Sequence, residues 1–221
     1  MAKTIKLSSL FLLTISLLFI GCQYNVKDHT KPKVDETLVN KHLLHDYKPI
    51  AENGNINVVI EIPAGTLEKC EVDKTSGDLS LEEIDGKPRI VQYLAYPANY
   101  GMIPQTYLPK ELGGDGDPLD VIVLGDASEK GSVIECKLIG IMKMVDRGEQ
   151  DDKLIAVKID SPFNEINSIK ELNTQFKGVC VILETWFENY KGPNKVEVMG
   201  FEEKEFAENI LQEAINEYKK K

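Results

Sequence analysis

Residues 115–124 read Asp-Gly-Asp-Pro-Leu-Asp-Val-Ile-Val-Leu, an acidic loop that runs directly into an apolar stretch. Carboxylates packed this closely repel one another, so the loop predicts a bound cation, and oxygen ligands of this kind suit Mg²⁺. Gly113 and Gly114 let the chain turn back on itself, and Pro118 stiffens the exit of the loop. The stretch therefore predicts a metal-binding turn at the start of a strand.

A solvated acidic turn before a strand is the alternative interpretation of this loop. A calcium-binding EF-hand does not fit the spacing. If Asp115 were its first ligand, Leu119 would take the fifth position, where a ligand is needed. Asp120 would then take the sixth position, where a glycine is needed.

The N-terminus has the pattern of an export signal. Lys3 and Lys6 form a basic start, and the apolar residues 10–20 are too few to cross a bilayer comfortably. This stretch ends in a glycine before Cys22, which resembles a bacterial lipoprotein cleavage site. We therefore expect residues 1–21 to be a signal peptide and Cys22 to be lipidated, anchoring an exported protein to a membrane of the bacterial cell envelope. An ordinary secreted protein and an uncleaved anchor are the alternatives.

Residues 22–50 are polar and show no sustained periodicity, which predicts a tether. All the histidines of the chain, His29, His42 and His45, lie in this segment. Residues 51–221 suit a single domain. That domain cannot use histidine as a base or as a metal ligand.

Charge and cysteine content exclude several classes of protein. The formal charge is −10, and loss of Lys3 and Lys6 with the signal peptide would make it −12, which disfavours nonspecific nucleic-acid binding. Cys70, Cys136 and Cys180 are odd in number and form no Cys-x-x-Cys pair. They predict buried free thiols and neither a disulfide framework nor a zinc site.

Hydrophobic periodicity predicts a run of strands followed by two helices. Apolar residues alternate along residues 56–62, which is typical of a strand. Helical spacing from Phe176 to Tyr190 predicts one helix, and residues 206–215 predict a second, amphipathic one. This order implies a barrel-like α+β domain. Further strands are predicted at residues 69–73, 90–94, 119–124, 132–145 (as one bent strand or two), 154–159 and 196–198.

Ionisable residues interrupt the apolar stretches at several points. Each alone suits an ordinary surface charge. Together they combine acids with Lys, Arg and Tyr, which suggests metal ions holding a polyanionic substrate whose remaining charge needs cations. These residues are Glu61, Lys69, Glu71, Arg89, Asp146, Asp151, Asp152, Lys153, Tyr190 and Lys191.

From about residue 55 to residue 200, the order and spacing of these groups resemble the soluble inorganic pyrophosphatases of the family I type. The acidic sequence at residues 115–120 matches that family's signature. The resemblance implies an α+β fold, an OB-like five-stranded β-barrel with two flanking C-terminal helices. The supporting segments are Ile-Glu-Ile-Pro around Glu61, Lys-Cys-Glu at 69–71, Tyr-Pro-Ala-Asn-Tyr-Gly at 96–101, and residues 143–146, 151–154 and 190–191.

The resemblance also implies a metal site and a base. Asp117 would act as general base on a water that bridges two cations, because two cations lower the pKa of the water they share. Asp120 would also help to bridge the more tightly bound of these cations to the second one. Several Mg²⁺ ions would be held by Asp115, Asp120, Asp146, Asp151 and, through water, Glu61.

A phosphate clamp and a proton donor follow from the same resemblance. The clamp would neutralise the leaving phosphate and hold the scissile bond in line for attack. Tyr96 matches a tyrosine proposed as a proton donor, and packing beside Pro97 is the alternative role. The clamp residues would be Lys69, Arg89, Tyr100, Lys153, Tyr190 and Lys191.

Three functions are open at this point. The first is Mg²⁺-dependent hydrolysis of pyrophosphate to two phosphates by attack of a metal-bridged hydroxide. The second is an exported hydrolase of short polyphosphates, and the third is a non-catalytic barrel that binds divalent metals. We expect pyrophosphate as a partner, a membrane reached through Cys22, no nucleic acid, and a homo-oligomer, since members of the family form dimers or hexamers.

Overall fold

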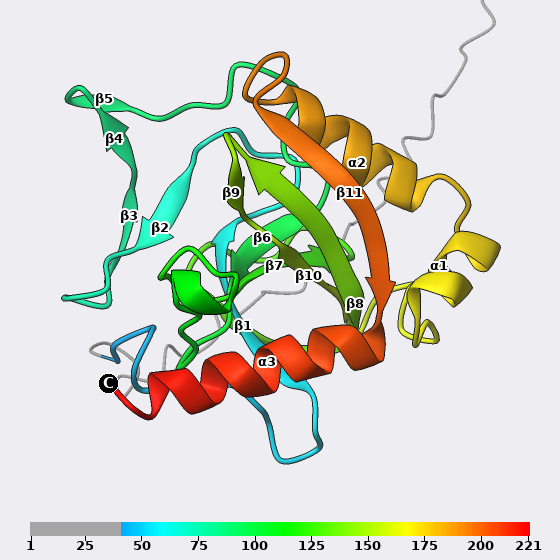
Figure 1. The fold of residues 1–221 in the computed structure, drawn as a ribbon, viewed down its shortest axis with the longest axis horizontal. Coiled ribbons are helices and arrows are strands. Elements are labelled where there is room, and N and C mark those ends of the chain that lie inside the picture. The colour runs from blue at the N-terminus through cyan, green and yellow to red at the C-terminus, as the bar shows by residue number, and fades with distance from the viewer. Residues whose placement is uncertain (1–40) are drawn as a thin grey trace, which may run out of the picture. The chain divides into compact units, whose positions relative to one another are not determined.

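Five strands close into a ring in the computed structural model, which describes residues 41–221 (Figure 1). The ring closes because β8 pairs with β1 on one side and with β10 on the other. The predicted five-stranded barrel is therefore confirmed. In order around the ring, the strands are β1 (Ile56–Ile62), β6 (Asn99–Met102), β7 (Asp120–Leu124), β10 (Lys153–Lys158) and β8 (Val133–Asp146).

The strand β8 is the longest element of the ring and also carries two strands outside it. The short β9 (Glu149–Gln150) and the long β11 (Val196–Glu203) both pair with β8. Residues 132–145 thus form one strand, and the strand predicted at 196–198 extends to residue 203. The pair β7–β10 is parallel, whereas the other pairs of the ring are antiparallel.

Two small hairpins project beside the ring (Figure 1). The first joins β2 (Cys70–Val72) to β3 (Leu79–Leu81), and the second joins β4 (Glu83–Ile84) to β5 (Lys87–Pro88). Residues 90–94, predicted as a strand, form only a single bridge from Ile90 to Glu68. Lys69 and Arg89 flank this pair of hairpins, so the hairpins bring two predicted clamp residues together.

The C-terminal part of residues 41–221 contains three α-helices, one more than predicted, with β11 between the second and the third. They are α1 (Ile169–Gln175), α2 (Val179–Asn189) and α3 (Lys204–Tyr218), and a short 3₁₀ helix, η2 (Lys110–Leu112), precedes the acidic loop. The predicted helix at 176–190 begins at Val179, because Gly178 takes a left-handed conformation there. None of the helices within residues 41–221 has both the length and the apolar composition that a membrane span requires.

The core consists of two large clusters that use alternate residues of the same strands. Val121 and Val123 belong to the cluster that packs against α3, whereas Ile122 and Leu124 belong to the cluster that packs against α1 and α2. This alternation follows from the two-residue period of a strand. Both helical layers are thereby fixed to the strands that carry the acidic residues.

The end of the predicted tether packs on the domain. Leu44 is buried against Val59 and Met102, and His45 Nδ1 lies 2.5 Å from the Tyr218 hydroxyl. Part of the predicted tether therefore contacts the domain, and the boundary at residue 51 stays a prediction. The predicted signal peptide, Cys22, His29 and the first part of the tether lie outside the described residues. Cys70, Cys136 and Cys180 are buried free thiols, as predicted.

Candidate active site

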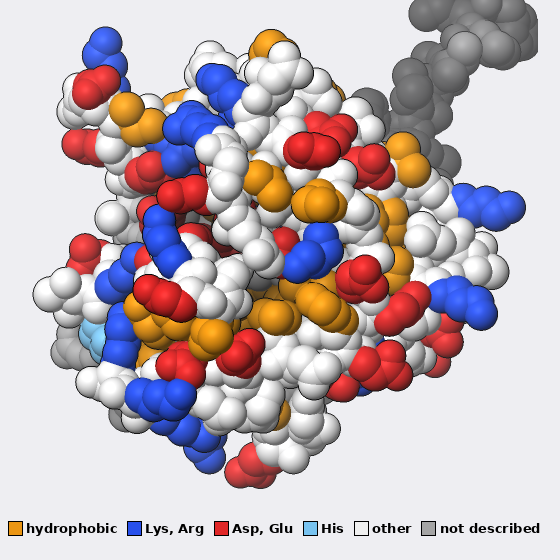
Figure 2. All heavy atoms as spheres, in the orientation of Figure 1, with side chains coloured by type: hydrophobic (Ala, Val, Ile, Leu, Met, Phe, Trp, Pro, Cys, Tyr) orange, Lys and Arg blue, Asp and Glu red, His pale blue; other side chains and the backbone are white. Residues whose placement is uncertain are grey.

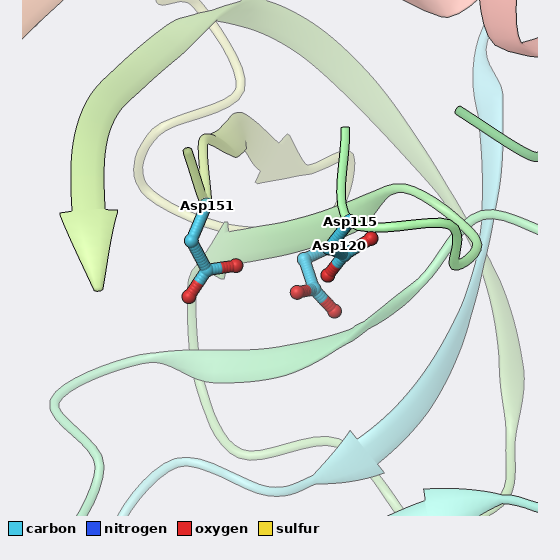
Figure 3. Close-up of side chains that lie close together, drawn as sticks. All are labelled: Asp115, Asp120 and Asp151. Carbon is cyan, nitrogen blue, oxygen red and sulfur yellow. The ribbon is translucent and has the colours of Figure 1, made fainter. Parts of the chain in front are cut away.

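Three carboxylates converge at one end of the ring. Oxygens of Asp115, Asp120 and Asp151 all lie within 4.8 Å of one another (Figure 3). Asp120 begins β7, and Asp151 comes two residues before the start of β10. The strands β7 and β10 are parallel, and Val121 of β7 lies opposite Leu154 of β10. Their first residues therefore lie side by side at the same edge of the sheet.

Lys153 lies inside this carboxylate group. Its ammonium pairs with both Asp120 and Asp151, and its side chain is only 4 % exposed. Burial opposes the charge of Lys153, but the two carboxylates raise its pKa above the ordinary value. Burial and the charges of Asp120 and Asp117 raise the pKa of Asp115. Three carboxylates face a single ammonium, so the negative charge of the group exceeds what Lys153 alone neutralises.

Asp146 and Glu61 extend the acidic group. At the end of β8, one oxygen of Asp146 accepts from Lys191 Nζ at 2.6 Å, and the other, Oδ1, is buried with no partner among residues 41–221. Glu61 is buried on β1 and accepts from the backbone N–H of Val72 at 2.9 Å. Burial raises the pKa of Glu61 to about 8, and the nearby Asp120 adds to the shift.

These donors fit a hard divalent cation. The ligands are carboxylate oxygens, which is the set that Mg²⁺ and similar ions prefer. The orphaned Oδ1 of Asp146 and the close oxygens of the three clustered aspartates are what a cation would satisfy. A bound cation would polarise phosphoryl oxygens and lower the pKa of water in the site.

Asp117 lies at the edge of the acidic group and outside the cluster of three. Its backbone N–H donates to Asp115 Oδ1 at 3.0 Å, which fixes the tight turn of the loop. Its carboxylate pairs with Lys74, which comes from the turn between β2 and β3. Both side chains are about half exposed, so Asp117 is accessible to a water molecule and can accept a proton.

The predicted clamp cations are held by acidic residues in this structure. Lys69 pairs with Glu71, and Arg89 Nη1 lies 2.7 Å from Glu82. Burial opposes the charge of Lys69, but Glu71 and Glu82 raise its pKa. Figure 2 shows basic and acidic side chains side by side around a hollow on this face. The arrangement suits a bound anion that takes the place of these carboxylates as the partner of Lys69 and Arg89.

The tyrosines of the predicted set form one aromatic group beside these cations. Ring centroids of Tyr96 lie 5.7 Å from Tyr100 and 6.4 Å from Tyr190, and Trp186 stacks on Tyr190 at 4.5 Å. Burial raises the pKa of Tyr190 to about 12 and moves the pKa of Tyr96 in the same direction. The tyrosines are therefore neutral phenols that can donate hydrogen bonds near neutral pH.

The structure places the predicted metal, clamp and catalytic residues near one another, whereas Cys22 lies outside the described residues. It also adds three contacting residues to which the sequence assigns no role. Lys74 and Glu82 pair with predicted site residues across turns, which no local pattern signals. The sequence marks Asp152 only as one of several charges, yet its carboxylate accepts from the Gln150 side chain at 2.7 Å and from the Met144 N–H at 3.0 Å. The adjacent pair of aspartates before Lys153 was its only sequence signal.

An acidic cluster faced by lysines, arginine and phenols at the end of a small barrel defines a class, the metal-dependent hydrolases of phosphate compounds. A family model described as inorganic pyrophosphatase matches residues 58–219. The chain belongs to the inorganic pyrophosphatase family. It therefore hydrolyses pyrophosphate with a divalent metal cofactor, and the alternative of a non-catalytic barrel no longer holds.

Individual relatives cover the same region. The inorganic pyrophosphatase of Helicobacter pylori strain 26695 is 40% identical over 165 residues, which cover 73% of this chain and 90% of the relative. That of Campylobacter jejuni is 39% identical over 171 residues, 74% of this chain and 92% of the relative. A solved Helicobacter pylori pyrophosphatase matches 75% of this chain and 94% of its own, with 39% identity and a TM-score of 0.64.

Proposed function

We propose that this pyrophosphatase uses Mg²⁺ as its divalent cation and that the sequence-predicted residues, with the exception of Tyr96, have their expected roles. The observation that carries the proposal is the cluster of Asp115, Asp120 and Asp151 within 4.8 Å, directly beside buried Lys153. Oxygen-only ligands favour Mg²⁺, which keeps several waters and binds phosphate groups together with carboxylates. Asp146 and Glu61 complete the ligand set.

The reaction breaks the bridging P–O bond and forms a new P–O bond to water. Asp117 accepts the proton that the attacking water loses, because it is accessible and lies on the same loop as Asp115. Lys69, Arg89 and Lys191 neutralise the departing phosphate, and Tyr100 and Tyr190 donate hydrogen bonds to it. Tyr96 is only 3 % exposed and packs on Trp186 at 4.5 Å, which favours a packing role over proton donation.

Phosphate release from pyrophosphate by the purified protein tests this proposal. We expect turnover with Mg²⁺, none after chelation, and a loss of about 100-fold or more in kcat for Asp117→Asn. Unchanged kcat in the variant would place the base elsewhere. Turnover with other divalent ions but not with Mg²⁺ would contradict the choice of metal.

We also propose that the protein works outside the cytoplasm as a lipoprotein. The support is the basic start at Lys3 and Lys6, the apolar residues 10–20 and the following Cys22. The family match begins only at residue 58, so these features lie outside it. Cys22→Ser should move the protein from the membrane fraction to the soluble fraction.

An exported enzyme could also meet short polyphosphates, and higher kcat/KM on tripolyphosphate than on pyrophosphate would favour that substrate.

A homo-oligomer is proposed on the basis of one apolar surface. Val181 on α2 is 61% exposed and Leu94, in the segment before β6, is 70% exposed. Both line a hollow of about 270 Å³ together with Tyr93 and Ile182. Exposed apolar groups gathered in this way are typical of contacts between subunits. Light scattering on the purified protein should give more than one chain, and Val181→Asp should reduce that number.

A further inference from the structure

Glu82 lies between two predicted clamp residues and is joined to both by backbone hydrogen bonds. Its N–H donates to the Lys69 carbonyl at 2.9 Å, and its own carbonyl accepts from the Arg89 N–H at 2.8 Å. The Lys69 N–H in turn donates to the Arg89 carbonyl at 3.0 Å. The hairpin β4–β5 spans residues 83–88, so it is the element that places Arg89 opposite Glu82.

The Glu82 side chain also contacts both cations. Arg89 Nη1 donates to its two oxygens at 2.7 and 2.8 Å, and Lys69 Nζ lies 3.1 Å from Oε2. The side chains are 23% exposed for Glu82, 25% for Arg89 and 13% for Lys69. Charge-assisted hydrogen bonds at partly buried sites are stronger than those at the surface, so these contacts restrict the rotamers of both long side chains.

The contacts leave donors free for a second anion. Among residues 41–221, the Arg89 guanidinium donates side-chain hydrogen bonds to Glu82 alone, and it does so through Nη1. Its Nε and Nη2 therefore remain available for a phosphate oxygen, since a guanidinium carries five N–H donors in a fixed plane. Lys69 likewise keeps one of three donors after pairing with Glu71 and Glu82.

We propose that Glu82 is a positioning residue for pyrophosphate binding, which holds Lys69 and Arg89 with their free donors directed at the substrate. The inference rests on the proposed clamp roles of those two residues. Pre-ordering two flexible side chains lowers the entropy that binding must otherwise overcome. The opposite view is that Glu82 only neutralises cations. That view predicts tighter pyrophosphate binding once its charge is removed.

Steady-state kinetics of Glu82→Gln separate these views. We expect KM for pyrophosphate to rise about tenfold while kcat changes less than about threefold, because binding geometry is lost and the acidic cluster is intact. Glu82→Asp keeps the charge and should recover part of the affinity. The matched control is Glu83→Gln, whose side chain is exposed on β4 and has no ion pair among residues 41–221.

Two further measurements make the outcome decisive. Thermal unfolding and the affinity for Mg²⁺ alone should match the unmodified protein in Glu82→Gln, which excludes a general structural defect. An unchanged or lowered KM in Glu82→Gln overturns the inference. If Arg89→Gln raises KM while Glu82→Gln does not, only the inference fails; if Arg89→Gln leaves KM unchanged, the proposed clamp fails with it.

Discussion

The carboxyl of Glu61 shows how a single buried residue links the metal site to stability. Its pKa is about 8 in the folded protein, mainly through burial, against an ordinary value of 4.5. Between these two values the folded state holds a proton that the unfolded chain has lost. The free energy of unfolding therefore falls as pH rises through this window, and the penalty is complete above about pH 8.

Glu61→Gln should remove that penalty in the metal-free protein. The amide oxygen can still accept from Val72 N–H, so the hydrogen bond survives. We expect little change near pH 5 and a stability gain that grows toward pH 8, up to about 1.4 kcal/mol for each unit of pKa shift. Urea unfolding in EDTA across this range measures it. A gain that does not depend on pH would contradict the prediction.

At the scale of elements, the sequence predicts strands of the ring better than short connections. The strands β1, β7 and β10 follow from apolar runs with strong periodicity. β6 was missed, because its four residues include Gly101 and two polar or aromatic residues, Asn99 and Tyr100, in place of an apolar run. Its strand conformation depends on partners β1 and β7, which are distant in sequence.

The helix α1 was also missed, although a local signal for it exists. Ser168 caps the helix by accepting from the Glu171 N–H at 3.0 Å, and Glu171 accepts from the Asn167 N–H at 2.8 Å. This Ser-x-x-Glu pattern is typical of a helix start. The seven-residue helix has too few apolar positions to show a period, so the capping residues were its only usable signal.

The candidate site was predictable residue by residue only where a family motif marks it. The acids, the predicted clamp cations and the tyrosines stand in ordered segments that resemble a known family. Glu82 and Lys74 stand in hairpins whose pairing decides what they contact, and a single sequence carries no information on such pairings.

Two loops carry the clustered aspartates, and contacts made by neighbouring residues join these loops. Lys110 of η2 pairs with Glu149 of β9 at 3.0 Å. Gly113 also packs closely on Gln150, since a Cβ added at Gly113 would lie 2.9 Å from Gln150 Oε1. Asp152 accepts a hydrogen bond from the Gln150 side chain and also pairs with Lys143 of β8. Asp152 thereby stabilises the turn that presents Asp151.

Asp152→Asn should weaken metal binding by about tenfold without removing a ligand, because the turn that carries Asp151 loses its ion pair with Lys143. Calorimetric titration with Mg²⁺ measures the change directly. Glu165→Gln serves as a control, since that carboxylate is exposed and forms no ion pair within residues 41–221. Equal affinity in Asp152→Asn and the unmodified protein would show that the turn holds its shape without this contact.

At the scale of the whole molecule, closure of the ring depends on Gly101. A Cβ at this position would lie 1.9 Å from the Val59 carbonyl oxygen, which is backbone of the neighbouring strand β1. That pairing also sets Tyr100 opposite Ile62, the residue after Glu61. Separation of β1 from β6 would open the ring and displace both the buried acid and a tyrosine of the clamp.

Gly101→Ala should therefore lower the free energy of unfolding by at least about 2 kcal/mol and reduce activity together with it, because a backbone carbonyl cannot move aside without breaking the strand pair. Gly54→Ala is the control: its φ of +85° also disfavours alanine, but no atom of residues 41–221 lies within 4 Å of the added Cβ. That strain alone should cost about 1 kcal/mol. Denaturant unfolding of both variants measures the difference. A Gly101→Ala loss no larger than that of Gly54→Ala would mean that the ring tolerates a wider spacing between β1 and β6 than the observed contact implies.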